Sequence, residues 1–590
     1  MGIKNDIINR YIIDNNLPNA KIIDSKDSSL FDYYPLDNIP AGIGLADTIF
    51  LNENNELIYG FLKDNKEEEM QLCIGYTGSG KSQRLVLQQA KVAIERGHSC
   101  LITDTSGQLI DYLYDYLKLK NVNIRIINFG NTDKSDRYNP FYNEALKVKK
   151  FKKVFSSTEQ ICEDFSKLVI SGTTTDPSWS NGARSLVNGL VLSFFEDVAS
   201  GMIEPEDVTI YNVVKSFHWL MEEVTKNSSI ADLGSMDYYK DKDSFCSSIQ
   251  HIAPIAQNAD TTRAGYFGVA ADYVNEIENE IIYEITSSNT FDISELWTKQ
   301  TVIFINTADK SIGDMITSIL VNDLYERAID ESSKSVTKRL PRVIHLFLDE
   351  FANIQFTDNK QFELMLTTTR KMQIFFNMYI QSYSQLITKF GEATTTTILA
   401  NCTQVFLGTR DYESRSKFAM SCGKKTIESF DSYCGSGHPG LVQVDVLNPE
   451  QLGLMKKGEM YILRQGYDVI KTYFEAAYKC KDFIPTKTYI EKFKSNKYDY
   501  ENKIMIQPLI VKKVNVKKLN ERNLTDYISR RELEEYENII NNNTYSSFIL
   551  MKKFERLGLI KQLGKKYIGL IDPLVIEKFK TRRKSIFDDF

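Results

Sequence analysis

Residues 71–90 read QLCIGYTGSGKSQRLVLQQA, and this stretch decides the fold. It opens with Gln71–Ile74, a short apolar segment of the kind that forms a buried strand. It closes with helical periodicity from Ser82 to Ala90. Between them, Gly75–Ser82 matches the pattern G-x-x-x-x-G-K-[ST]. A strand, a glycine-rich turn and a helix in this order predict a phosphate-binding loop, or P-loop.

The chemistry of such a loop follows from its glycines and its place before a helix. Glycines let successive backbone N–H groups converge on phosphate oxygens, and the helix dipole favours an anion there. We expect Lys81 to neutralise the β- and γ-phosphates of ATP and the Ser82 hydroxyl to bind Mg²⁺. The residues expected to contact the nucleotide are Gly75, Thr77, Gly78, Ser79, Gly80, Lys81 and Ser82.

Apolar segments of strand length recur on both sides of a long helical region. Strands alternating with helical patterns predict a parallel sheet with crossover helices. Between residues 143 and 293 helical patterns dominate, so the α/β domain is expected to be interrupted by an all-α insertion. The further strands are expected at 99–104, 124–129, 301–306, 343–348, 374–380 and 404–408.

The end of the chain has a different pattern. A helix is expected at 545–559, followed by two strands in 560–571 with a tight turn at Gly564, which is the ending of a winged helix. The fold class is therefore an α/β P-loop NTPase domain with an inserted all-α domain and a small winged-helix-like C-terminal appendage. The expected divisions are an N-terminal arm (1–45), the nucleotide-binding domain in two parts (46–145 and 294–485), the insertion (146–293) and a C-terminal extension (486–590).

Composition narrows the classes of function. With 590 residues, 42% hydrophobic content and a net charge of −6, the chain is long enough for several domains and is not a globally basic nucleic-acid binder. Its eight cysteines form no C-x-x-C pair, which favours free thiols over a structural metal site. No segment has the roughly 18 apolar residues of a membrane span, and no signal peptide is evident. We expect a cytoplasmic protein.

A second motif, which is acidic, complements the P-loop. Val343–Leu348 is apolar except for His345 and ends in Asp349 and Glu350, the form of a Walker B motif. Carboxylates at the end of a parallel strand lie where open α/β sheets bind ligands. Asp349 is expected to hold Mg²⁺ together with Ser82, and Glu350 to polarise the attacking water as a general base.

Two further residues are candidates for catalysis. Gln381 falls at the end of the strand expected at 374–380, where a glutamine can sense the γ-phosphate or position water. Arg370 precedes that strand and is a candidate arginine finger for the nucleotide of a neighbouring subunit. Arg410, after the strand expected at 404–408, is the alternative finger.

These motifs together resemble the type IV coupling proteins, the TraG/TraD-type ATPases of conjugation. The resemblance runs from about residue 68 to 425, with the motifs in the order of the family. Thr103–Leu109 resembles the D-P-K-G-E-L segment but departs from it at Thr105, Ser106 and Gln108. The other matching segments are Leu348–Ile354, Tyr138–Phe141, Ile380–Leu386, and Ala400–Cys402 followed by Gly408.

The resemblance implies a RecA-like domain in a ring, expected to be a homo-hexamer, that moves DNA through a central channel. It assigns the trans arginine to Arg370 and the sensor to Gln381. The implied partners are single-stranded DNA with its relaxase and a type IV secretion channel. Many members of the family have N-terminal transmembrane helices, and none is expected here, so recruitment to the inner face of the membrane would need a membrane partner.

The last forty residues are locally basic. Residues 551–590 hold eleven Lys and Arg against five acids, opposite in sign to the whole chain. Such a segment either binds DNA or a partner protein, or is simply a solvated tail.

Three functions fit these observations. The first is an ATP-driven DNA translocase that couples a relaxase–DNA substrate to a conjugative channel. The second is a related motor of the FtsK/HerA type that acts in packaging, element maintenance or defence. The third is a nucleotide-gated receptor that hands over its substrate without pumping DNA.

Overall fold

The computed structural model describes most of the chain. The expected turn at Gly564 and most of the helix expected at 545–559 lie outside the described residues. The described ranges are 20–25, 29–39, 45–54, 56–63, 69–172, 176–201, 203–226, 246–256, 258–308, 311–356, 359–429, 440–480, 484–490, 524, 528, 530–544, 550–551, 554, 559–563 and 566–581.

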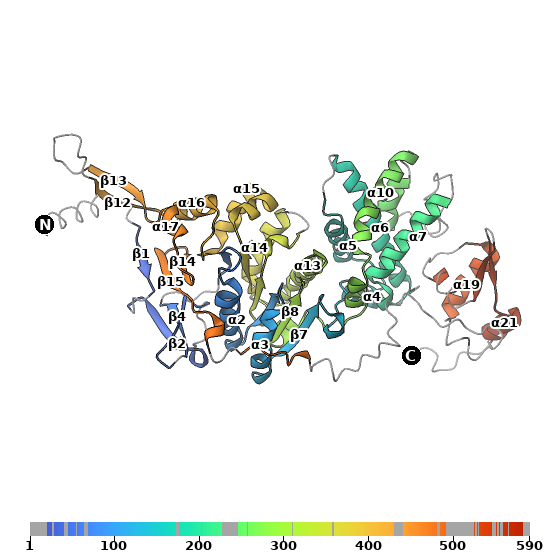
Figure 1. Ribbon diagram of the computed structural model, residues 1–590. Helices are drawn as coiled ribbons and strands as arrows, with labels where there is room; N and C mark the ends of the chain where they lie inside the picture. The colour runs from blue at the N-terminus through green and yellow to red at the C-terminus, as the bar shows by residue number, and fades with distance from the viewer. Residues whose placement is uncertain are drawn as a thin grey trace. The chain divides into compact units, whose positions relative to one another are not determined.

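The chain forms two compact units (Figure 1). The sheet unit comprises Met1–Ser135 and Phe291–Asn496, and the helical unit comprises Asp136–Thr290 and Lys497–Phe590. The helical residues are therefore an insertion between two halves of the sheet unit. The C-terminal segment groups with this insertion and not with the sheet.

The sheet unit is built on ten strands in the order β1-β15-β14-β11-β5-β10-β9-β6-β8-β7. From β11 to β7 every neighbouring pair is parallel. The predicted α/β class with a large parallel sheet is confirmed. The parallel strands are β5 (Gln71–Ile74), β6 (Ser99–Thr103), β7 (Asn123–Asn128), β8 (Thr301–Asn306), β9 (Ile344–Leu348), β10 (Ile374–Ile380) and β11 (Thr403–Phe406).

Helices cover these strands, and their apolar faces form the core. The helical turn η2 (Lys81–Val86) and α2 (Leu87–Glu95) join one buried cluster with α3 (Gln108–Leu119) and the sheet. In α2 eight of nine residues are buried, as expected of a crossover helix enclosed by other elements. The other helices are α12 (Glu295–Thr298), α13 (Ser311–Ser333), α14 (Asn359–Met372), α15 (Tyr383–Asn401), α16 (Tyr412–Ser421) and α17 (Pro449–Gly453).

One edge of the sheet differs from the sequence expectation. β14 (Glu459–Leu463) pairs antiparallel with both β11 and β15 (Val469–Tyr473), and β1 (Ile22–Asp24) pairs with β15. A separate sheet holds β2 (Phe31–Pro35), β3 (Thr48–Leu51) and β4 (Leu57–Leu62). The segment 1–45, expected to be an arm, thus contributes β1 and β2. A further hairpin joins β12 (Lys424–Ser429) to β13 (Gly440–Asp445).

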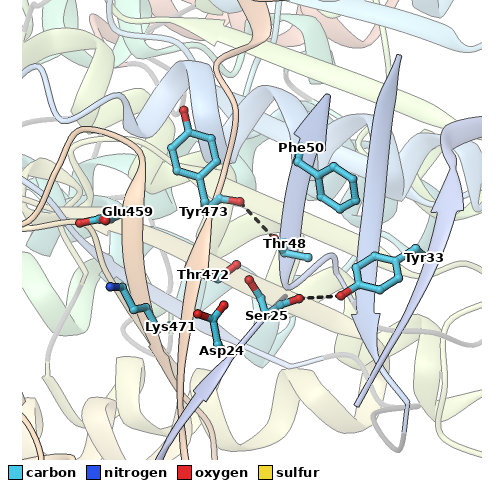
Figure 2. Close-up of a pocket in the computed structure, with 9 residues that line it drawn as sticks. All are labelled: Asp24, Ser25, Tyr33, Thr48, Phe50, Glu459, Lys471, Thr472 and Tyr473. Atoms are coloured by element: carbon cyan, nitrogen blue, oxygen red, sulfur yellow. Dashed lines mark hydrogen bonds between the residues drawn. The ribbon is translucent and has the colours of Figure 1, made fainter. Parts of the chain in front are cut away.

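A cavity of about 630 Å³ lies between this edge and the small sheet (Figure 2). The rings of Tyr33 and Phe50 meet edge to face across 5.7 Å, and the Tyr33 hydroxyl donates to the Ser25 carbonyl at 2.6 Å. The cavity is lined in part by β15, which is three strands away from β5 in the sheet. The cavity is lined by Asp24, Ser25, Tyr33, Thr48, Phe50, Glu459, Lys471, Thr472 and Tyr473.

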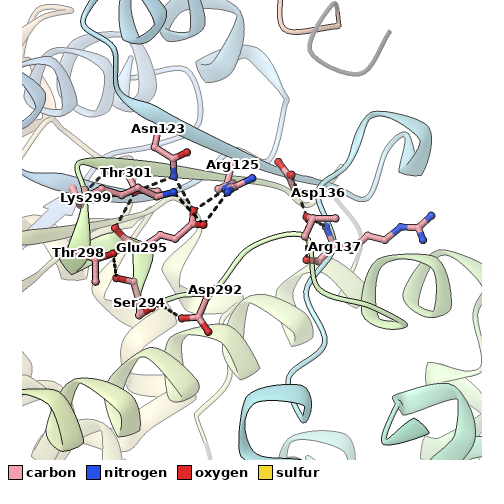
Figure 3. A network of polar contacts seen from close by, with 12 residues as sticks. Asn123, Arg125, Asp136, Arg137, Asp292, Ser294, Glu295, Thr298, Lys299 and Thr301 are labelled. Atoms are coloured by element: carbon pink, nitrogen blue, oxygen red, sulfur yellow. Dashed lines mark hydrogen bonds and ion pairs between the residues drawn. The ribbon is translucent and has the colours of Figure 1, made fainter. Parts of the chain in front are cut away.

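A polar network lies where the second half of the sheet unit begins (Figure 3). The Arg125 guanidinium donates to both carboxylate oxygens of Glu295 at 2.8 Å, and the Asn123 amide donates to the same carboxylate at 2.8 Å. Burial raises the pKa of Glu295, but these hydrogen bonds outweigh burial and hold the pKa below its usual value. β7 is thereby joined to α12, the short helix that leads back into β8.

The helical unit is centred on α6 (Pro177–Ser200), which packs against α4, α5, α9 and α10. Asp176 caps its N-terminus by accepting from the Ser178 N–H, Pro177 occupies the first turn, and Gly201 (φ +74°) ends it. The surrounding helices are α4 (Tyr142–Phe151), α5 (Ser156–Val169), α7 (Ile210–Lys226), α9 (Ser247–Ala256), α10 (Asp260–Ile277) and α11 (Glu280–Thr286).

The described C-terminal residues form helix α19 (Arg530–Asn542), the antiparallel hairpin β16 (Ile560–Leu563) and β17 (Lys566–Gly569), and helix α21 (Pro573–Thr581). The hairpin was expected from the sequence. Of the eleven basic residues counted there, the structure describes Lys561, Lys566, Lys578 and Lys580.

Two histidines of the sheet unit lie side by side, His345 fully buried and His98 partly buried. The exception in the apolar strand β9, His345, is fully buried, and its Nε2 lies 3.1 Å from Nδ1 of His98. Burial lowers the pKa of His98 to about 3 and that of His345 well below its usual value. Both rings are therefore neutral at physiological pH, so they act as polar core residues and not as a charge switch.

A buried ion pair fixes β14 to the small sheet. Arg464, 4% exposed, contacts Asp47 at 2.8 Å and Glu69 at 2.9 Å. The other carboxylate oxygen of Asp47 accepts from the Leu62 N–H at 3.0 Å. Burial raises the pKa of Asp47, although Arg464 lowers it. The guanidinium therefore compensates a carboxylate that would otherwise be unpaired in the interior.

Replacing Arg464 by Met should destabilise the protein by about 3–5 kcal/mol, because it leaves a buried carboxylate without its partner. The measurement is chemical unfolding followed by fluorescence. Lys334→Met is the control, since Lys334 pairs with Glu331 on an exposed helix end and its loss should cost less than about 1 kcal/mol. Equal losses of stability in Arg464→Met and Lys334→Met would contradict the role of Arg464 as the partner of a buried carboxylate.

Candidate nucleotide-binding site

The glycine-rich loop is held at the carboxyl edge of the parallel strands. It follows β5, and two of its first backbone groups bond to the neighbouring strand ends. The Gly75 N–H donates to the Ile380 carbonyl at 3.0 Å, and the Tyr76 N–H donates to the Gly408 carbonyl at 3.1 Å. These acceptors end β10 and follow β11, the two strands beside β5. The sheet therefore fixes where the loop begins.

The glycines of the loop are required by its backbone. Gly78 and Gly80 have φ values of +86° and +97°, a region that side chains other than glycine rarely adopt. A Cβ at Gly75 would lie 2.6 Å from Ser79 Oγ, so a side chain there would fill the loop. Thr77 is exposed at the tip. The backbone of the loop therefore curves around an open space, and Ser79 borders that space on one side.

The polar side chains of the loop suit an anion. Lys81 is 7% exposed, and its ammonium donates to the Gly75 carbonyl at 2.8 Å, so it is folded back across the curve. Ser79 is 4% exposed, and its hydroxyl oxygen has no hydrogen-bond partner among the residues that the structure describes. A buried hydroxyl without a partner is costly, and a phosphate oxygen would satisfy it.

Asp349 lies opposite the loop, at the end of β9. The Ser82 hydroxyl donates to its carboxylate at 3.4 Å, and its own N–H donates to Thr103 Oγ1 at 2.6 Å. Burial raises the pKa of Asp349, while Lys81 lowers it and Glu350 raises it again. The expected pair of Ser82 and Asp349 is therefore brought together in space, 267 residues apart in the chain.

Glu350 and Gln381 meet beside this pair. The Gln381 amide nitrogen lies 3.2 Å from each carboxylate oxygen of Glu350. Glu350 has φ +51° and ψ +44°, a left-handed conformation that costs a non-glycine residue free energy. The Gln381 N–H donates to Gln385 Oε1 at 2.9 Å. The strained backbone turns the Glu350 carboxylate toward Gln381.

The strand order explains why these residues converge. β10 lies between β5 and β9 and is parallel to both, with Ile380 beside Ile74 and Met378 beside Leu348. Residues that follow the three strands must therefore gather at one edge of the sheet. Gln381 is consequently placed between the loop and the Walker B carboxylates.

The two candidate arginines lie at different edges. Arg370 is exposed in the last turn of α14, before β10 begins, so the whole of β10 separates it from Gln381. Seven residues of strand span about 23 Å. Arg410 is exposed two residues after Gly408, on the edge that carries the loop. Arg370 is therefore remote from the loop of its own chain, whereas Arg410 lies on the same edge of the sheet as the loop.

Two buried groups near the loop were not predicted as site residues. Burial raises the pKa of Asp104 to about 6, and its carboxylate accepts from the N–H groups of Gln108 and Ile110 at the start of α3. The charge of Asp349 raises the pKa of Asp104 further, so the two carboxylates are close enough to repel one another. The signal was available, because Asp104 ends an apolar strand just as Asp349 does.

The second such group is Arg84, one turn into η2. It is 3% exposed, donates to the Phe474 carbonyl, lies 3.7 Å from Glu475 and covers the ring of Tyr473 at 5.6 Å. It therefore ties the helix that begins at Lys81 to the end of β15. No local pattern in the sequence indicates this contact, since its partners are about 390 residues away.

A glycine-rich loop at the end of a central strand, a buried lysine, a serine–aspartate pair and a glutamate–glutamine pair on one sheet edge define a P-loop NTPase domain. A family model, Type IV secretory system Conjugative DNA transfer, matches residues 46–506. The chain belongs to this family. The resemblance drawn from the motifs is confirmed.

The solved structures to which the chain is similar include coupling proteins of conjugation. The bacterial conjugative coupling protein TrwBdeltaN70 is 16% identical with a TM-score of 0.49, over 70% of this chain and 88% of that one. Plasmid coupling protein TrwB in complex with ADP and Mg²⁺ is 16% identical with a TM-score of 0.49, over 71% and 87%. VirB4 of Thermoanaerobacter pseudethanolicus is 13% identical with a TM-score of 0.43, over 75% and 98%. The family assignment rests on the family model and not on these likenesses.

No curated protein matches the chain. Within the described ranges, none of the helices combines the length and the apolar character needed to cross a bilayer.

Asp349→Asn should separate stability from ligand binding. A carboxyl whose pKa is raised on folding stabilises the protein below its unfolded pKa and loses that contribution as pH rises through the folded pKa. At neutral pH the ionised Asp349 is therefore a cost, and the amide should leave the melting temperature of the ligand-free protein unchanged or raise it. The same variant should lose the upward shift that MgATP gives the wild type. A lower ligand-free melting temperature with a retained MgATP shift would contradict this role.

Proposed function

We propose that this chain is an ATP-driven DNA translocase of conjugation, which recruits a relaxase–DNA substrate and delivers it to a type IV secretion channel. The observation that carries the proposal is the assembly at one sheet edge of a phosphate loop and a glutamate–glutamine pair, with Glu350 and Gln381 3.2 Å apart. Membership of the conjugative DNA transfer family supports the choice of substrate.

The residues of the loop fit a nucleoside triphosphate with Mg²⁺. Ser79 presents a buried hydroxyl without a partner in the described part of the chain, and Lys81 presents a buried ammonium. Ser82 and Asp349 supply the hydroxyl and carboxylate oxygens that Mg²⁺ prefers. When bound, the ion neutralises phosphate charge that a single lysine cannot balance. We therefore propose that the nucleotide is bound by Gly75, Thr77, Gly78, Ser79, Gly80, Lys81, Ser82 and Asp349.

Hydrolysis follows from the neighbouring pair. In this proposal the Glu350 carboxylate accepts a proton from the attacking water. Gln381 holds that carboxylate through its amide, and it follows directly on the strand beside β5, so it can respond to the state of the γ-phosphate. A movement of Gln381 would then pass along β10 and α15, the two elements that it joins.

We propose that the site is completed in a homo-hexameric ring by Arg370 of a neighbouring subunit. Arg370 is exposed, and the length of β10 separates it from the loop of its own chain, as a residue that serves another subunit requires. Arg410 remains the alternative, because it lies on the edge of the sheet that carries the loop. The two candidate arginines can be distinguished by mixing Lys81→Ala subunits with subunits that carry either Arg370→Ala or Arg410→Ala.

The partners proposed are single-stranded DNA bound to its relaxase and the secretion channel. We place the ring in the cytoplasm at the inner face of the membrane, held there by a membrane partner of the channel. The described C-terminal lysines 561, 566, 578 and 580 lie on or beside the hairpin β16–β17 and α21, a surface able to contact DNA backbone.

The proposal predicts ATP hydrolysis that single-stranded DNA accelerates. Lys81→Ala should lower the rate at least about 100-fold, because it removes charge stabilisation at the phosphates. Lys118→Met, an exposed lysine on α3, is the matched control and should hydrolyse ATP at the wild-type rate. The assay measures phosphate release and oligomeric state together, with and without a single-stranded oligonucleotide.

Two results would count against the proposal. Hydrolysis by the wild type that DNA leaves unchanged, with no DNA crosslinked inside the assembled ring, would favour a nucleotide-gated receptor. A wild type that hydrolyses no ATP in any oligomeric state, with or without DNA, would exclude a motor.

A further inference from the structure

Lys389 on α15 is a partly buried lysine with no part in the chemistry described so far. Its ammonium donates to the carbonyl of Ala352 at 2.7 Å and to that of Ile354. Burial lowers its pKa to about 7, and Asp314 raises it. An ammonium withdrawn from water needs hydrogen-bond partners, and Lys389 donates to backbone carbonyls of a single turn.

That turn is the one that carries Glu350. It continues from Glu350 through the short helix η6 (Phe351–Asn353), with the Asn353 N–H donating to the Glu350 carbonyl at 2.8 Å. Because Glu350 is in the left-handed region, the turn would relax if its surroundings released it. Lys389 binds carbonyls of the second and fourth residues after Glu350, and so it holds the far side of this strained turn.

The residue after Lys389 holds the same turn by apolar contact. Phe390 stacks on Phe351 with ring centroids 5.9 Å apart and an interplanar angle of 20°. Phe351 is fully buried and also meets Phe362 at 5.4 Å. Lys389 and Phe390 therefore contact the turn together, one by hydrogen bonds and the other by ring stacking.

The same stretch of helix is tied to Gln381 at its other end. Gln385, in the first turn of α15, accepts from the Gln381 N–H at 2.9 Å. Gly391, with φ +77° and ψ +169°, interrupts the helix immediately after Phe390. Residues 383–390, which we name the brace, therefore form one short helical segment. It contacts the sensor glutamine at one end and the Glu350 turn at the other.

We propose that Lys389 is a positioning residue for ATP hydrolysis, which acts through the brace to keep the Glu350 carboxylate against the Gln381 amide. This inference rests on the proposed ATPase activity. The carbonyls that Lys389 binds belong to neither the loop nor Asp349, so its loss should leave nucleotide binding intact and reduce the chemical step.

The test compares Lys389→Met, Lys389→Arg and the control Lys118→Met. Lys389→Met should lower kcat roughly 10- to 100-fold, because misplacement of a catalytic group by about 1 Å has effects of this size. KM for ATP and the Kd of a fluorescent ATP analogue should stay within about 2-fold, since the loop residues are untouched. Arginine also donates several N–H groups, so Lys389→Arg should recover most of kcat. Lys118→Met should match the wild type.

A role in stability alone gives a different pattern. Lys389→Met with an unchanged kcat, a parallel loss of kcat and nucleotide affinity, or no recovery by arginine would each overturn the proposal. If Lys389→Met does not fold, Phe390→Leu loosens the other half of the same contact, and it should lower kcat without weakening nucleotide binding.

Hydrogen exchange makes the test independent of activity. The amides of Phe351 to Ile354 should exchange faster in Lys389→Met than in the wild type, while those of the loop at 75–82 should not change. Unchanged exchange at 351–354 overturns the inference even in a protein that hydrolyses no ATP. A wild type without ATPase activity, in contrast, refutes the proposed function.

Discussion

The position of β10 between β5 and β9 is the constraint on which the rest of the site depends. Each strand delivers one part: β5 the phosphate loop, β9 the two acids and β10 the glutamine. Parallel strands carry these parts to the same edge, so no long-range folding of loops is needed to assemble them. The hydrogen bonds from Gly75 to Ile380 and from Gln381 to Glu350 show that the three ends are also joined directly. A slip of β10 by one residue would break both.

This arrangement concentrates negative charge that the protein alone does not neutralise. Asp104 and Glu350 each interact electrostatically with Asp349, Lys81 is the cation that acts on Asp349, and burial raises the pKa of both aspartates. The backbone at Glu350 is strained, and the Ser79 hydroxyl has no hydrogen-bond partner among the residues that the structure describes. These costs are typical of a site shaped for a ligand, and the buried sheet and its helices supply the stability that offsets them. Arg84 and Lys389 are two cations through which more distant elements hold this edge in place.

The local sequence pattern was enough to predict the parallel strands and to pick out candidate site residues at their ends. Apolar runs identified β5 to β11 because a strand covered on both faces has few polar residues. The glycine pattern, Asp349-Glu350 and Gln381 followed from motifs at strand ends. Pattern failed where contacts are distant or elements are short. β1 has three residues, β14 and β15 pair antiparallel at an edge, and Arg464 meets Asp47 across more than 400 residues. Lys389 looked like any helical lysine, since only the folded chain shows which carbonyls it binds.

The coupling between Glu350 and Gln381 tests the central claim most directly. The measurement is a double-mutant cycle on kcat for ATP hydrolysis, with Glu350→Gln, Gln381→Ala and the variant that carries both. If the two residues act as one unit, the double variant should be within about 3-fold of the slower single variant, because the second substitution removes nothing further. A double variant slowed by the product of the two single effects would show that they act independently. That result would contradict the claim that β10 brings Glu350 and Gln381 together as one functional unit.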